Sequence, residues 1–192
     1  TLLAFKNEDF PVTMLLEGAA LPDKVYLSTA GRKFRMAPNE AGMFNYNFQN
    51  VQRDVSFTIE AAGFSTQEVD VKVVERPNLK DFSVYLNYPD YLGKEDERLN
   101  NVGNIQVPEG TNISWKFNAL SADSMWLRFV NQEEVYQLEE ENDEVFTFEK
   151  QIFQPDHYQV DLKNEYSANK QNIRYYLDVI PDQHPKISLE QF

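Results

Sequence analysis

One histidine in this sequence stands beside a carboxylate within a predicted strand, in the pair Asp156 and His157. A carboxylate that orients a histidine can make it a general base, but such a base needs a nucleophile within reach. The sequence contains no GxSxG or HExxH motif and no Gly-rich phosphate loop. We therefore expect Asp156 to cap the turn into its strand and His157 to face solvent. The chain is predicted not to be an enzyme.

A second route to catalysis is a pair of carboxylates that face one cleft about 5 to 9 Å apart, as glycoside hydrolysis requires. The carboxylates of this chain fall mostly in turns and at outward strand positions. A hydrolase is therefore disfavoured.

Residues 133–149 hold eight carboxylates and no Lys or Arg. Clustered acids attract Ca²⁺, which takes about six to eight oxygen ligands. Adjacent strand residues point to opposite faces, however, and no DxDxDG-like spacing is present. A solvated hairpin around Asn142 and Asp143 is predicted, and no metal or other cofactor. Asp178 and Asp182 weakly resemble the calcium-binding link of cadherins, but a plain linker is favoured.

Three tyrosines follow one another closely at Tyr85, Tyr88 and Tyr91, with Pro89 between the last two. Aromatic rings on a surface bind sugars or peptides through their apolar faces. Packing at a domain junction explains the same residues without a ligand. Tyr88 and Tyr91 are the candidate ligand-binding residues of this sequence.

The net charge of −13 narrows the range of partners. Nucleic acids and anionic membrane surfaces both call for clustered Lys and Arg, so neither is expected to bind. Cys is absent, which excludes disulfides and thiolate sites. No apolar run approaches the ~20 residues of a membrane span, and the N-terminus TLLAFKNEDF lacks the layout of a signal peptide. We expect a soluble piece, mature or excised, without direct membrane contact.

The elements that hold these side chains are predicted to be strands. In residues 107–129, Ile113, Trp115 and Phe117 alternate with polar residues, which is the period-2 pattern of a half-buried strand. A polar corner over residues 118–124 then leads into a second strand that carries Met125 and Leu127. This order resembles strands B and C of an immunoglobulin-like sandwich.

The first half of the chain repeats in the second at an offset of about a hundred residues. The matched segments, written in one-letter code, are MLL at 14–16 with WKF at 115–117, VYL at 25–27 with MWL at 125–127, FRM at 34–36 with YQL at 136–138, FNY at 44–46 with FTF at 146–148, DVSFTI at 54–59 with HYQVDL at 157–162, and VKV at 71–73 with LDV at 177–179.

Pro77 interrupts the strand pattern and marks the junction between the two copies. The sequence therefore predicts an all-β protein of two tandem immunoglobulin-like β-sandwich domains, residues 1–76 and 77–185. Residues 186–192 form a linker or the start of a following domain. The first copy lacks a counterpart of the strand at 82–88 unless residues 2–5 supply it. The polar segment 93–104 is predicted to be an exposed loop.

The pieces NYPDYLGK, NVGN and VPEGT carry a more specific resemblance. The chain resembles the repeated sandwich region of an uncharacterised family of very long bacterial envelope proteins, best known from Bacteroidetes-type genomes. In that family membrane-spanning helices precede the sandwich region. The resemblance implies a periplasmic or otherwise extracytoplasmic location and a membrane-anchored parent protein. It implies no activity and no functional residue.

The sequence thus predicts a non-catalytic structural or interaction module. The alternative is a carbohydrate- or ligand-binding module that uses Tyr88 and Tyr91. Its expected partners are another protein or the neighbouring domains of the parent chain, and the fragment is expected to be a monomer or weak dimer. Residues 186–192 are expected to be disordered or docked on a sheet edge.

Overall fold

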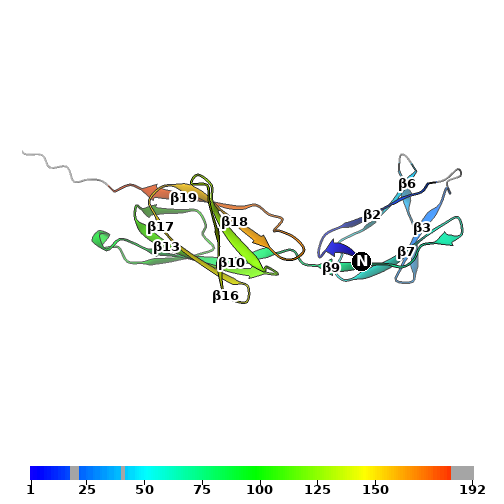
Figure 1. Ribbon diagram of the computed structural model, residues 1–192, viewed down its shortest axis with the longest axis horizontal. Coiled ribbons are helices and arrows are strands. Elements are labelled where there is room, and N and C mark those ends of the chain that lie inside the picture. The colour runs from blue at the N-terminus through cyan, green and yellow to red at the C-terminus, as the bar shows by residue number, and fades with distance from the viewer. Residues whose placement is uncertain (18–21, 40–41, 183–192) are drawn as a thin grey trace, which may run out of the picture. The chain divides into compact units, whose positions relative to one another are not determined.

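The computed structural model describes residues 1–17, 22–39 and 42–182 and is all-β, with one short 3₁₀ helix (Figure 1). The chain divides into two compact units. Unit 1 is Thr1–Glu75, and unit 2 begins at Arg76. Within the described residues, no helix has both the length and the apolar character needed to cross a bilayer.

Unit 1 is built from two sheets. One has the strand order β1-β9-β7-β3-β4, with β8 paired to β7, and the other has the order β2-β6-β5. The strands are β1 (Leu2–Phe5), β2 (Phe10–Leu15), β3 (Val25–Thr29), β4 (Arg32–Arg35), β5 (Ala37–Pro38), β6 (Met43–Phe48), β7 (Val55–Ala61), β8 (Phe64–Ser65) and β9 (Val69–Val74).

Unit 2 also has two sheets, with the orders β11-β10-β13-β17-β16 and β12-β19-β18-β14-β15. The helix η1 (Asp90–Leu92) lies between β10 and β11 in the chain. The strands are β10 (Asn78–Asn87), β11 (Glu97–Asn100), β12 (Ile105–Pro108), β13 (Thr111–Leu120), β14 (Ser124–Phe129), β15 (Glu134–Gln137), β16 (Glu139–Asn142), β17 (Val145–Ile152), β18 (Asp156–Lys163) and β19 (Ile173–Ile180).

The two units share one topology, but the strand ladders shift two of the matched segments of the repeat by two residues, because they place Met14 where unit 2 has Phe117 and Ile59 where unit 2 has Val160. In unit 2, β10, β13, β17 and β16 correspond to the A, B, E and D strands of an immunoglobulin-like sandwich, and β19, β18 and β14 correspond to G, F and C. In unit 1, β2, β6 and β5 take the places of β13, β17 and β16, while β9, β7 and β3 take those of β19, β18 and β14. The predicted tandem of immunoglobulin-like sandwiches is confirmed.

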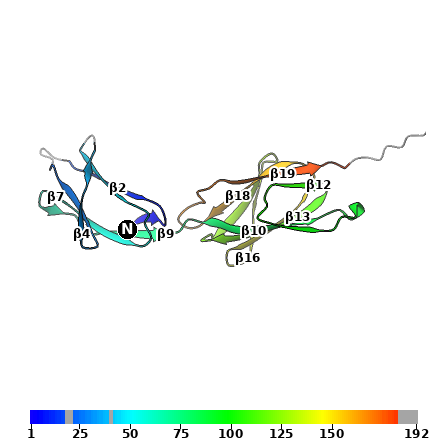
Figure 2. The same cartoon turned by 180° about the vertical axis from the view of Figure 1, so that it is seen from behind.

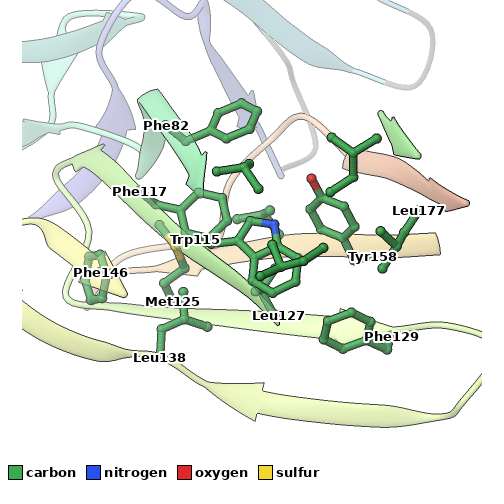
Figure 3. Close-up of a cluster of buried hydrophobic side chains, with 14 of the residues drawn as sticks. Phe82, Trp115, Phe117, Met125, Leu127, Phe129, Leu138, Phe146, Tyr158 and Leu177 are labelled. Carbon is green, nitrogen blue, oxygen red and sulfur yellow. The ribbon is translucent and has the colours of Figure 1, made fainter. Parts of the chain in front are cut away.

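The core of unit 2 follows directly from strand alternation. Ile113, Trp115 and Phe117 on β13 are each at most 1% exposed, while the residues between them are half-buried. From the facing sheet, Phe129 and Tyr158 meet the Trp115 ring edge-on, with centroids 6.1 and 5.6 Å away (Figure 3). Such aromatic pairs add stability beyond the apolar area that they bury.

The role of residues 2–5 differs from the one considered from the sequence. β1 pairs in parallel with β9, as β12 pairs in parallel with β19 (Figure 2). It is therefore the counterpart of β12 and not of β10. Within the described residues, unit 1 has no counterpart of β10.

The segment 93–104 is not simply an exposed loop. Residues Glu97–Asn100 form β11, which pairs with β10, and Gly103 is buried. Asn101 exchanges two hydrogen bonds with the Phe82 main chain, and the Gly103 carbonyl accepts one from the Tyr158 hydroxyl at 2.7 Å. The side chains of Asn101 and Asn104 thus accept main-chain hydrogen bonds from the two sheets, from Phe82 and Tyr176 respectively, which polarity alone does not reveal. The predicted tail 186–192 lies outside the described residues.

Candidate functional site

The predicted site residues Tyr88 and Tyr91 line one surface depression of about 430 Å³ at an end of unit 2. Pro89 leads into η1, and Gly93 closes it in the left-handed region with φ of 58°. This short turn carries Tyr91 past the end of β10. The remaining wall comes from the end of β10, from η1, from the β12–β13 turn and from the ends of β17 and β19, and it comprises Asn87, Asp90, Glu109, Gly110, Asn112, Gln151, Phe153 and Asp182.

Tyr88 belongs to the core and is only 4% exposed. Its hydroxyl donates a hydrogen bond to Glu97 Oε2 at 2.9 Å, and Lys94 Nζ lies 3.8 Å from the ring centroid. Desolvation by burial, followed by the contact with Glu97, raises the pKa of Tyr88 even though Lys94 opposes the change. The expected exposure of this ring is wrong, because the ring packs against the core of unit 2.

Tyr91 is 65% exposed and has the surface position expected of a ligand-binding ring. Partial desolvation, followed by the charges of Asp182 and Glu109, raises its pKa. Phe153 lines the same depression and is 58% exposed. Sequence reasoning missed Phe153, because it lies more than sixty residues away in the chain and only the fold brings it here.

Tyr85 does not join the depression. It lies on β10 at a position of opposite parity to Tyr88, so the two side chains leave opposite faces of the sheet. Arg98 of β11 lies over its ring, with Cζ 5.1 Å from the centroid. The three tyrosines therefore do not form one aromatic patch.

The depression can bind a neutral or cationic ligand. Its charged wall residues are Asp90, Glu109 and Asp182, and no Lys or Arg among the described residues lines it. Tyr91 and Phe153 offer apolar ring surface, while the amides of the wall offer both donors and acceptors. The Asp182 main-chain N–H donates to Glu109 Oε2 at 3.1 Å, which ties the two acidic segments together.

Asp156 serves the fold, but the predicted cap of the turn into its own strand is wrong, because its carboxylate bonds the turn between β14 and β15. Its carboxylate is fully buried and accepts main-chain hydrogen bonds from Asn131 at 2.7 Å, from Gln132 at 3.2 Å and from His157 at 2.6 Å. The Gln132 side chain adds a further bond at 3.0 Å. The turn between β14 and β15 is thus closed by this carboxylate. His157 is half-buried, and its ring contacts Tyr176 edge-on at 5.1 Å.

The acidic run forms the predicted hairpin, with β16 and β17 paired around the turn after Asn142. Lys150 pairs with Glu134 at 2.6 Å, and Lys116 pairs with Glu141 at 2.7 Å. Lys116 comes from β13, which β17 separates from β16, and Lys150 comes from β17, in the other sheet from β15. The fold thus compensates charge that the local sequence leaves unbalanced. Across the part of the chain that the structure describes, no group of three or more His, Asp or Glu is arranged to hold a metal ion.

Comparison with known proteins adds architecture alone. The chain matches no family model and no curated protein in sequence. It is similar to the fibronectin(III)-like modules of Clostridium thermocellum CbhA, with 10% identity, a TM-score of 0.40, and 97% of this chain and 95% of that chain covered. The titin I-band fragment I67-I69 gives 10% identity, a TM-score of 0.42 and coverages of 93% and 62%.

The ectodomain of mouse nectin-like molecule 4 gives 9% identity, a TM-score of 0.41 and coverages of 94% and 66%. At such values the function has to be argued from this chain's own residues. No family or curated match supports the resemblance to bacterial envelope proteins, which stays a prediction.

Proposed function

We propose that this chain is a non-catalytic structural or interaction module. The proposal rests on the hydrogen bonds of Asp156, which has the one fully buried carboxylate among the described residues. Buried carboxylates with a histidine neighbour are common starting points for catalysis. Here the carboxylate is occupied by three main-chain N–H groups and one side-chain amide, so it orients a turn and not a reacting group.

The wider proposal places the chain in the extracytoplasmic part of a larger membrane-anchored protein. Its support is the resemblance carried by NYPDYLGK, NVGN and VPEGT. In that setting the two sandwiches space and present surfaces to a protein partner or to neighbouring domains of the parent chain. Fractionation of cells that express the tagged parent protein tests the location, and recovery in the cytoplasm would contradict it.

We also propose that residues 1–76 and 77–185 fold as separate domains, with 186–192 as a linker or the start of a following domain. Each unit has its own hydrophobic cluster. Limited proteolysis followed by mass spectrometry is the test. Cleavage near Pro77 with two resistant fragments is expected, whereas a resistant fragment that straddles Pro77 overturns the division.

A carbohydrate-binding module is the second candidate, and the depression at Tyr91 is the observation that favours it. A glycan array of neutral oligosaccharides separates the two candidates when it is probed with the whole chain, with Tyr91→Ala and with Phe153→Ala. Tyr85→Ala is the matched control, because that ring lies outside the depression. Binding that both wall variants lose and the control keeps would replace the leading proposal. Release of product from any glycan on the array would contradict the non-catalytic reading.

A further inference from the structure

A second depression, of about 560 Å³, lies on the outer face of the β12-β19-β18-β14-β15 sheet of unit 2. Its floor consists of Trp126 and Arg128 from β14 together with Gln159, Asp161 and Lys163 from β18. Val135 of β15 lines one side, and residues 168–172 line another. We name this surface the Trp126 face.

Strand alternation explains why an indole lies on this surface. Met125, Leu127 and Phe129 point into the core and are fully buried, so Trp126 and Arg128 leave the opposite face of β14. The immunoglobulin fold ordinarily buries a Trp on this strand. Here the core position is filled by Trp115 from β13 (Figure 3). Trp126 is half-buried and is not required to fill the core.

The charge of the Trp126 face is opposite to that of the chain. Arg128, Lys163 and Lys170 line it against one carboxylate, Asp161. The chain as a whole carries −13, and the depression at Tyr91 has acidic wall residues without a cation. A local cluster of one sign attracts ligands of the other, and concave walls focus that field. The Trp126 face therefore favours anions.

The polar groups beside the indole are held in place by contacts within the sheet. Asp161 pairs with Arg128 Nη2 at 3.5 Å and accepts a hydrogen bond from Gln159 Nε2 at 2.7 Å. Lys163 Nζ lies 5.0 Å from the Trp126 ring centroid. Asn169 fixes the loop wall to β18 by exchanging two hydrogen bonds with the Leu162 main chain, at 2.9 and 3.0 Å. Because these side chains are already held in place, they lose little further conformational entropy when a ligand binds.

We propose that the Trp126 face binds an acidic saccharide, with the indole stacked on a pyranose ring. The apolar face of the ring packs on the indole. Arg128 and Lys163 receive a carboxylate or sulfate group, for which charge-assisted hydrogen bonds are the strong ones. Gln159 and the loop amides bond the hydroxyl groups. The proposal deepens the proposed interaction role by naming a partner class, and it does not depend on Tyr91.

The test is a titration of the whole chain with uronate and sulfated oligosaccharides, each beside a neutral oligosaccharide of the same length. Trp126→Ala and Arg128→Ala are each expected to weaken binding by about tenfold or more. Trp126→Phe keeps a ring and should retain part of the affinity. Lys116→Ala and Tyr91→Ala are controls that lie outside the depression and should leave binding unchanged. Trp115 fluorescence verifies that each variant remains folded.

Several outcomes overturn the proposal. They are the absence of binding by every acidic saccharide, equal binding of the neutral partner, and unchanged binding in Trp126→Ala. Equal loss in Lys116→Ala would show non-specific charge attraction. Complete competition by a poly-glutamate peptide would show an anion site without saccharide recognition. Neutral glycans that bind through Tyr91 would replace the proposed structural or interaction module with a carbohydrate-binding module and leave the Trp126 face unaffected, so the two failures are distinguishable.

Discussion

Strands β2 and β13 occupy the same place in their units, yet their inward side chains are buried to different degrees. Val12 is 8% exposed where its ladder counterpart Trp115 is 1% exposed, and Met14 is half-buried where Phe117 is fully buried. The cause is the strand alongside. In unit 2, β10 pairs with β13 along its whole length and places Phe82, Val84 and Leu86 over the core. The same alternation thus gives fully buried inward side chains only in unit 2, where β10 lies alongside β13 as the A strand.

The edge of β2 also differs in sequence from that of β13. Pro11 lies within β2, opposite Asn47 of β6, and Pro has no N–H to donate. Ser114 is its counterpart in β13, where it pairs with Tyr85 of β10. Pro is confined in sheets to edge strands whose N–H side faces away from a partner. The core side chains of unit 1 are therefore less completely buried. The edge of β2 is also less able to pair with another strand.

The largest expected effect comes from substituting Ala at corresponding core positions of the two units. Phe117→Ala should destabilise unit 2 by about 3–5 kcal/mol, because the ring is fully buried. Its counterpart Met14 is half-buried, and Met14→Ala should cost unit 1 only about 1–2 kcal/mol. Both Trp lie in unit 2, so Trp fluorescence during denaturation reports that unit alone.

Hydrogen exchange read by mass spectrometry follows unit 1 in the same samples. Lys116→Ala is the control, because its ion pair with Glu141 is exposed and should contribute about 0.5 kcal/mol or less. Equal shifts of the Trp fluorescence midpoint in Phe117→Ala and Lys116→Ala would contradict the inward register of β13.

Gly103→Ala is the next largest expected change. A Cβ at this position would lie 2.2 Å from Tyr175 Cδ1, and the ring is confined by Phe82 and Tyr158. We expect a loss of about 3 kcal/mol in unit 2 from overpacking. In unit 1, Gly31 has φ of 73° and open space around it, so Gly31→Ala should cost about 1 kcal/mol through backbone strain alone. A Gly103→Ala protein with the wild-type fluorescence midpoint would show that the Tyr175 ring moves freely.

Asp156→Ala tests the turn that unit 2 closes with a buried carboxylate. Its removal leaves three main-chain N–H groups without their acceptor, and we expect a loss of about 2 kcal/mol. In unit 1 the exposed Asp54 accepts one hydrogen bond, from the Val73 N–H at 2.7 Å. Water can replace that bond, so Asp54→Ala should cost about 0.5–1 kcal/mol. Hydrogen exchange at the Asn131 and Gln132 amides tests the loss of these bonds directly. Unchanged protection in Asp156→Ala would contradict the role of this carboxylate in holding the turn.

The smallest expected effect is the change in the folding stability of each unit as pH falls. Hydrogen bonds from the Asn50 main chain and the Asn47 side chain lower the pKa of Asp9 below its ordinary 3.8. In unit 2, hydrogen bonds from Lys150 and Tyr136 lower the pKa of Glu134. A carboxyl whose folded pKa is lowered stabilises the fold above its unfolded pKa, and this contribution disappears as pH falls through the folded value.

Both units should therefore lose stability as pH falls below about 4. Asp9→Asn should flatten this loss in unit 1 and Glu134→Gln should flatten it in unit 2, each without affecting the other unit. Denaturation midpoints at pH 6 and pH 3 provide the measurement. A variant whose acid response matches that of the wild type would show that the named carboxyl does not control it.

The local pattern of the sequence determined the strands, their inward faces and the repeat. These depend on period-2 alternation and on turn residues, which act over a few neighbouring positions. Ile113, Trp115 and Phe117 are buried as their spacing predicts, whereas Asp156 caps the turn between β14 and β15, which lies far from it in the chain. The hairpin of the acidic run also follows from the local signal at Asn142 and Asp143.

Tertiary structure alone decided which residues share a surface. Tyr88 and Tyr91 differ in burial because the first packs against the core and the second follows a 3₁₀ turn, and Phe153 joins Tyr91 from a distant strand. Trp126 shares its surface with Lys163 because the fold pairs β14 with β18, which lies more than thirty residues further along the chain. Such outcomes depend on competition for space between segments far apart in the chain. Spacing along one strand carries no information about that competition.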